Sequence, residues 1–163
     1  MARPVTIFTG QWADLGLEEM CSLAKQMGYQ GLEIATWGQL NVRKAAEDTD
    51  YVAQVKNTLE KYGLGCWAIG AHLPGQCVGD LWDSRLDGFA PAELAGKPEE
   101  IRAWGIEEMK YAAKAAKAMG VKVCLLYTSW IYQRKQRLIQ RRRFRIWKRI
   151  FSFYIKFRRV LGV

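Results

Sequence analysis

Three stretches of the sequence share one pattern, in which a helical segment ends at a glycine and a hydrophobic run follows at once. They are MGYQGLEI at residues 27–34, YGLGCWAI at residues 62–69 and MGVKVCLL at residues 119–126. Glycine is common just after a helix because it adopts the left-handed backbone conformation without steric cost. A helix that leads almost directly into an apolar strand is typical of a βα repeat, which predicts neighbouring parallel strands covered by helices.

The residues around these stretches extend the repeat in both directions. Short apolar runs predict strands at residues 5–9, 31–36, 64–71 and, as the beginning of a fourth, 121–127. Apolar residues at helical spacing predict helices at residues 17–27, 50–62 and 98–119. Asp50 is the expected N-cap of the second helix. The pattern therefore predicts an α/β protein with four parallel strands and three intervening helices.

The connection after the third strand is much longer than the others. Between Ala71 and Pro98 lie 26 residues, whereas such loops usually have about 2 to 6. In barrels of parallel strands, the loops that follow the strand C-termini form the active-site face. We therefore expect the long loop of residues 73–97 to overhang a functional site, with Asp80 and Asp83 as solvated loop acids.

Alternation along the strands indicates which side chains face that site. Glu33 shares one side of the second strand with small residues, and His72 shares one side of the third with Cys66. Trp67, on the opposite side by parity, is expected in the layer beneath the helices, with the large apolar residues. Glu33 and His72 are therefore expected to converge inside the strands, towards their C-terminal ends.

Composition favours one globular domain in a reducing compartment. Half of the 163 residues are hydrophobic, and there are 15 Gly and 4 Pro. No apolar run approaches the ~20 residues of a spanning helix, and no charged segment precedes an apolar one at the start. The four cysteines form no C-x-x-C pair and suggest neither a disulfide framework nor a zinc ribbon. We expect a cytoplasmic protein.

The net charge of +9 belongs to the end of the chain. Residues 130–163 contain 12 Lys or Arg and no acidic residue. The first 129 residues hold the other 13 basic residues and all 16 acidic residues, a net charge of −3. We therefore divide the chain into residues 1–126, with the βα repeat, and residues 127–163, a basic and aromatic tail that is helical or disordered.

Three segments carry a family resemblance: LEEMCSLAKQMGYQGLEIATWG at residues 17–38, VKNTLEKYGLGCWAIGAHLPGQ at 55–76 and IEEMKYAAKAAKAMGVKV at 106–123. They resemble the sugar phosphate isomerase/epimerase family of xylose-isomerase-like TIM barrels, over about residues 4–123. The GLEI run at Glu33 and the AHLPG run at His72 are the most specific pieces. The resemblance implies a partial (β/α)₈ barrel, the N-terminal half of the family fold.

The resemblance also implies a chemistry, which is proton transfer beside a sugar carbonyl. In the family, a divalent metal (Mn, Mg, Co or Zn) polarises the sugar oxygens, and two carboxylates act as base and acid. Most metal ligands come from strands five to eight, which this chain does not reach. We therefore expect a truncated, inactive isomerase-like or epimerase-like chain that binds no metal firmly, with its catalytic residues unknown.

The candidate substrate-binding residues for a sugar or sugar phosphate are Glu33, His72, Trp12 and Trp37. Glu33 and His72 match family positions near the substrate, and His72 is also a metal-ligand candidate by analogy with the distant endonuclease IV-type relatives. Each residue also has a structural alternative. Glu33 would be a barrel carboxylate paired with Lys or Arg, and His72 would be a hydrogen-bonded residue at a strand end. Trp12 and Trp37 follow the first two strands, where an aromatic ring can stack on a sugar or simply pack.

Two interpretations of the tail remain open, and they separate the functional alternatives. Its interleaved basic and aromatic residues would allow an amphipathic helix for RNA or an anionic membrane, and hence a non-catalytic binding protein. Alternatively, CLLYTS at residues 124–129 resembles sequencing-adapter read-through, followed by translated noncoding DNA. An endonuclease IV-like repair enzyme is a third hypothesis, disfavoured by the single histidine and the acidic first 129 residues.

Overall fold

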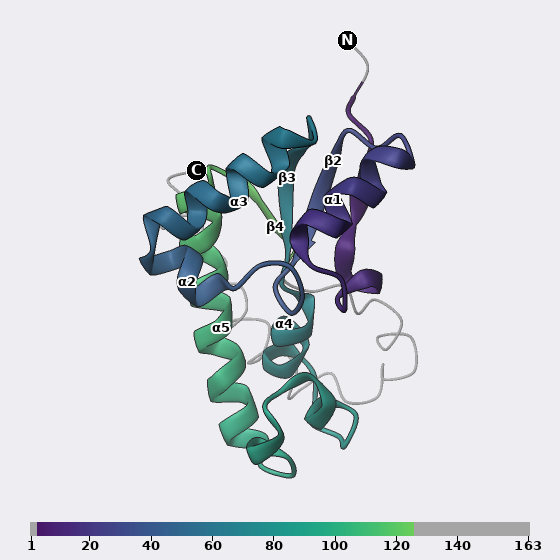
Figure 1. Ribbon diagram of the computed structural model, residues 1–163. Helices are drawn as coiled ribbons and strands as arrows, with labels where there is room; N and C mark the ends of the chain where they lie inside the picture. The colour runs from purple at the N-terminus through teal and green to yellow at the C-terminus, as the bar shows by residue number, and fades with distance from the viewer. Residues whose placement is uncertain (1–2, 126–163) are drawn as a thin grey trace.

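One four-stranded parallel sheet organises the computed structural model, which describes residues 3–125 (Figure 1). The strands are β1 (Thr6–Phe8), β2 (Gly31–Ala35), β3 (Gly65–Gly70) and β4 (Val123–Leu125). They lie in the order β1-β2-β3-β4, and each pairs in parallel with the next. The predicted α/β fold is confirmed, and the sheet is that of a partial (β/α)₈ barrel.

The three predicted helices connect these strands and cover one face of the sheet. They are α1 (Leu17–Gln26), α3 (Thr49–Lys61) and α5 (Pro98–Met119). Figure 1 shows α1 and α3 crossing in front of the strands. Gly28, Gly63 and Gly120 follow the three helices with φ of 85°, 62° and 73°, which confirms the predicted glycine stops.

The core lies between these helices and the sheet. Leu32 and Ile34 of β2 and Ile69 of β3 are fully buried there. They pack in one cluster with apolar residues from the helices: Met20, Cys21, Ala24, Val52, Val55, Leu59, Ala112, Ala115, Ala116 and Met119. Alternate residues of each strand therefore anchor the sheet to the helix layer.

Two further helices, which the sequence did not predict, lie in the connections after β2 and β3. Helix α2 (Val42–Glu47) begins after Asn41, whose side chain accepts a hydrogen bond from the backbone N–H of Lys44. Asp48, not Asp50, then caps α3, because its carboxylate accepts from the backbone N–H groups of Asp50 and Tyr51. The prediction of Asp50 as the cap was wrong. Asp48 has the extended backbone of an N-cap, and Asp50 lies inside the first turn of α3.

The long connection before α5 is also partly helical. It contains α4 (His72–Gly79) and two short 3-10 turns, η2 (Leu86–Phe89) and η3 (Ala92–Leu94). Helix α4 packs closely on α5 at Gly105, where an added Cβ would lie 2.8 Å from the carbonyl oxygen of Pro74 and 3.1 Å from the Cβ of Cys77. A glycine is required there because any side chain would push the two helices apart.

Strand β3 is irregular, and this overturns one prediction about its faces. Leu32 pairs with Cys66 and Glu33 pairs with Ala68, so Trp67 is an extra residue in β3. The Trp67 ring lies over Gly31, where an added Cβ would be 2.1 Å from it, and over Gly65. Trp67 therefore faces away from the helices and is 43% exposed, whereas Cys66 packs against the core. The predicted placement of both residues was wrong.

Two remaining expectations concern membranes and the tail. Within residues 3–125, no helix combines the length and apolar character needed to cross a membrane. The predicted basic tail of residues 127–163 lies outside the described residues.

Candidate functional site

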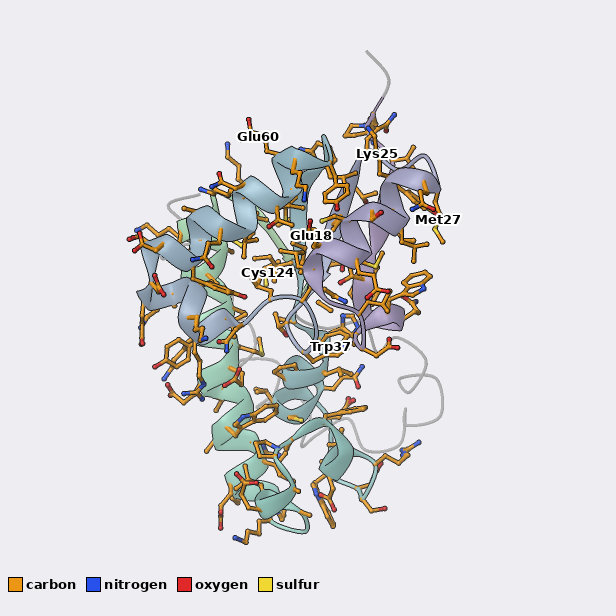
Figure 2. All side chains as sticks on the ribbon, in the orientation of Figure 1. Glu18, Lys25, Met27, Trp37, Glu60 and Cys124 are labelled. Atoms are coloured by element: carbon orange, nitrogen blue, oxygen red, sulfur yellow. The ribbon has the colours of Figure 1, made fainter. Side chains whose placement is uncertain are left out.

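The C-terminal ends of the first three strands bring three rings together. Phe8 ends β1, Trp37 follows β2, and His72 follows β3 as the first residue of α4. The His72 ring centroid lies 5.0 Å from that of Phe8 and 4.7 Å from that of Trp37, and the Phe8 and Trp37 centroids are 5.6 Å apart. In Figure 2, Trp37 lies beside the start of α4. The three rings form a cluster, hereafter the ring cluster, at one end of the sheet.

Glu33 lies on the same face of the sheet as this cluster. A Cβ added to Gly70 would meet the Phe8 ring at 2.6 Å and Oε1 of Glu33 at 3.1 Å. The carboxylate and the Phe8 ring therefore share the space above Gly70, on the face opposite Leu32 and Ile34. This matches the predicted inward orientation of Glu33, although its role in binding stays a prediction.

Burial changes the acidity of Glu33. The side chain is partly buried, and this desolvation raises the pKa of its carboxyl group above 4.5. No hydrogen bond or ion pair to this carboxylate occurs among residues 3–125, so a Lys or Arg partner, the structural alternative, is not found in that part of the chain. A carboxyl group of raised pKa can hold a proton nearer to neutral pH.

His72 occupies a helix start, not the end of a strand. Strand β3 stops at Gly70, and the backbone turns at Ala71 into α4. The His72 side chain still reaches the ring cluster, where desolvation lowers the pKa of its imidazole. Its Nδ1 atom is buried without a hydrogen-bond partner among the described residues. The His72 ring therefore carries a buried nitrogen atom that no described residue satisfies with a hydrogen bond.

Two residues that follow the first strand, Trp12 and Thr9, make structural contacts. Trp12 lies in the 3-10 turn η1 (Thr9–Trp12) and packs against the core cluster. Thr9 is fully buried, and its hydroxyl oxygen accepts a hydrogen bond of 3.0 Å from the backbone N–H of Ala35. These contacts fix the loop after β1, while sugar binding by Trp12 stays a prediction.

Gln39 makes a contact between two loops that the sequence did not reveal. It is 7% exposed, and its side-chain amide donates hydrogen bonds to the backbone oxygens of Trp12 and Leu15. It therefore ties the loop after β2 to the loop after β1. A lone glutamine in a loop gives no periodic signal, so only the folded structure shows this contact.

Several buried polar atoms near the strand ends lack partners. Oγ1 of Thr36, Oε1 of Gln39 and Nδ1 of His72 make no hydrogen bond among the described residues. Thr36 follows β2 directly, and His72 follows β3 after a single residue. A buried polar atom without a partner costs about 1–3 kcal/mol, so a ligand or water that satisfied these atoms would be stabilised.

The described residues do not form a metal centre. Within residues 3–125, no group of three or more His, Cys, Asp or Glu side chains is arranged to hold a metal ion. Asp83, a loop acid, forms a bidentate ion pair with Arg85, with an Nη2–Oδ2 distance of 2.6 Å. His72 and Glu33 alone are fewer than the three protein ligands of a typical catalytic site.

The cysteines behave as small apolar residues. All four lie in the described part of the chain as free thiols. Burial raises the pKa of Cys21, Cys66 and Cys77 to about 11 and that of Cys124 to about 12. Thiols of such high pKa are poor nucleophiles at neutral pH, in agreement with a packing role.

The parallel strands lie in sequential order, crossover helices cover one face of the sheet, and polar groups lie at the C-terminal strand ends. These features define a protein of the α/β-barrel class. The family model described as xylose isomerase-like TIM barrel matches residues 21–151, which is more than half of the chain. The chain belongs to this family, as the resemblance in its sequence implied. No curated protein matches it.

Proposed function

We propose that the chain carries the substrate-binding part of a sugar isomerase or epimerase site. The observation that carries this proposal is the convergence of Glu33 and the ring cluster at the C-terminal end of adjacent parallel strands. That end holds the active site in barrels of this architecture. The family match supports the general class and leaves the particular sugar open.

The surroundings suit a sugar, which has both polar edges and apolar faces. Trp37 packs edge-on against Phe8 and His72. Oγ1 of Thr36 and Nδ1 of His72 are buried without partners among the described residues, and each would gain a hydrogen bond from a sugar hydroxyl group that reached it. Aromatic rings with a few buried polar atoms are typical of small-molecule sites.

Glu33 would hold or accept a proton at its carboxyl oxygens. Its raised pKa results from desolvation, which also strengthens any hydrogen bond to a sugar hydroxyl. The described residues do not supply a metal centre or a second carboxylate beside Glu33. We therefore propose that the 163-residue chain binds a sugar without turning it over.

Binding and turnover can be measured on the same preparation. The probes are D-xylose, D-fructose and D-fructose 6-phosphate, each followed by calorimetry and, with added Mn²⁺, Mg²⁺, Co²⁺ or Zn²⁺, by NMR of the products. We expect weak binding of at least one sugar and no conversion. Glu33→Gln and His72→Phe should each weaken binding by about tenfold or more, a loss of roughly 1.4 kcal/mol.

Asp83→Asn is the matched control, because it removes a loop carboxylate whose ion pair lies with Arg85. Its sugar affinity should equal that of the wild type. Absence of binding for all three sugars, or equal affinity in all variants, would refute the site. Metal-dependent turnover that disappears in Glu33→Gln would refute the statement that the site is incomplete.

A further inference from the structure

A buried amide joins the loop after β2 to the loop after β1. The Nε2 atom of Gln39 donates hydrogen bonds to the backbone oxygens of Trp12 and Leu15, the second at 3.1 Å. A carbonyl oxygen only accepts hydrogen bonds, so the nitrogen of the amide must face these two atoms. Such bonds are stronger in a buried site of low dielectric than in water. The side chain therefore holds the two loops together at a defined place.

The backbones of the two loops also approach each other closely at Gly38, the residue before Gln39. A Cβ added to Gly38 would lie 3.0 Å from Cα and 3.1 Å from Cβ of Ala13. A side chain there would push the loops apart. We call the contacts of Gly38 and Gln39 with residues 12–15 the loop junction.

Trp37 stands directly before the loop junction and also contacts the first loop. A Cβ added to Gly10 would lie 2.8 Å from Cζ2 of Trp37 and 2.4 Å from the ring of Phe8. The indole therefore lies against the backbone of Gly10, edge-on to His72 with the centroids 4.7 Å apart. Because Trp37 and Gly10 belong to different loops, their contact exists only while the two loops stay together.

We propose that Gln39, with Gly38 beside it, is a positioning residue that fixes Trp37 at the ring cluster by holding the loop after β2 on the loop after β1. Gln39 need not touch a ligand for this role. A binding wall that is already in place loses less conformational freedom when a ligand arrives. The effect on sugar affinity rests on the proposed function, whereas the position of Trp37 does not.

The NMR signal of His72 reports the position of Trp37 without any sugar. His72 is the only histidine, so the ¹H–¹³C signal of its Cε1–H group is unique in the chain. The ring current of a nearby indole shifts this signal, and the shift falls steeply with distance. Trp37→Leu removes the indole and marks where the signal lies without it. The spectra are recorded at about pH 8, where a histidine of lowered pKa is neutral.

Gln39→Met keeps the length of the side chain and removes its hydrogen-bond donor. We expect the His72 signal of this variant to move from the wild-type position towards that of Trp37→Leu. Gly38→Ala leaves Gln39 in place but crowds Ala13, so it should move the signal in the same direction by a smaller amount. A role in stability alone would lower the melting temperature and leave the signal of the folded chain unchanged.

Gln26→Met is the matched control, because it makes the same chemical change away from the site. Gln26 is exposed at the end of α1, where its amide donates a hydrogen bond of 3.2 Å to the Ser22 hydroxyl. The His72 signal of this variant should coincide with that of the wild type. Circular dichroism on each variant shows that the chain is folded.

Sugar affinity separates this inference from the proposed function. Gln39→Met should weaken the binding of a sugar by about threefold to tenfold, because Trp37 is no longer held in place. If no sugar binds the wild type and the His72 signal moves as expected, the proposed function fails and the positioning role of Gln39 stands.

Two results would overturn the inference. One is a folded Gln39→Met chain whose His72 signal lies at the wild-type position, since Trp37 would then keep its place without the two hydrogen bonds. The other is an equal displacement in Gln26→Met, which would make the effect unspecific. If Gln39→Met does not fold, Gly38→Ala decides, and an unchanged His72 signal in that variant overturns the inference as well.

Discussion

The two faces of the same sheet differ in what covers them. On one face, Leu32, Ile34 and Ile69 are fully buried beneath three helices. On the other, Val123 and Trp67 keep about half of their surface exposed. The strands are apolar on both faces, as parallel strands generally are. The strand sequences are therefore suited to burial on both faces of the sheet, but the described residues bury only one face.

The same contrast explains where polar chemistry is located. The helix-covered face contains only apolar side chains. Their burial stabilises the fold by about 25 cal/mol per Å² of apolar surface removed from water. The open face carries Glu33, with Phe8 beside it. A carboxylate is tolerated there because solvent or a ligand can still reach it, although partial burial raises its pKa.

Truncation of one residue on each face gives the largest expected difference. Ile69→Ala should lower the free energy of unfolding by about 2–5 kcal/mol, because it leaves a cavity in the core. Val123→Ala should lower it by less than about 1 kcal/mol, since Val123 is half exposed. Urea unfolding measures both losses. Equal losses would mean that both faces are covered.

Packing outside the sheet is tested at Gly105. Gly105→Ala should cost about 1–3 kcal/mol, because the new methyl group meets backbone and side-chain atoms of α4. Gly88→Ala is the control, since no atom lies within 4 Å of its added Cβ. Thermal unfolding of the two variants compares them. If Gly105→Ala is as stable as Gly88→Ala, α4 does not pack on α5 as described.

A smaller effect concerns Glu33 and pH. Its pKa is raised above 4.5 in the folded chain, so the folded state binds this proton more tightly than the unfolded state. Stability from Glu33 is therefore highest at acidic pH and falls as the pH rises through the folded pKa. Glu33→Gln should make the protein slightly more stable than the wild type at pH 7. Denaturant unfolding at several pH values should show this gain disappearing in acid, and a gain equal at every pH would exclude the ionisation of Glu33 as its cause.

The sequence predicts the strands, three helices and their glycine stops because those features repeat. Apolar periodicity and a glycine after each helix are local signals, and Gly28, Gly63 and Gly120 adopt the expected conformation. The inward position of Glu33 follows from simple alternation in β2, which has no extra residue.

Other features depend on contacts that no local pattern shows. Trp67 changes face because β3 contains an extra residue, and this breaks the alternation used to place Cys66 and Trp67. Helix α4 was missed because Pro74 and two glycines hide its periodicity, although proline is tolerated in a first turn. The ring cluster forms from residues at or just after the ends of three strands, and Gln39 joins the loops after β1 and β2 through backbone oxygens.

His72 offers the most direct test of the site, because it is the only histidine in the chain. Its ring has one Cε1–H group, and the ¹H–¹³C NMR signal of that group needs no assignment by mutation. A pH titration with and without each sugar follows that signal in the complete chain. We predict a pKa below the ordinary 6.5, caused by burial, and a chemical-shift change when a bound sugar reaches the ring. A pKa of 6.5 or above, with no response to any sugar, would contradict a buried His72 in a sugar-binding site.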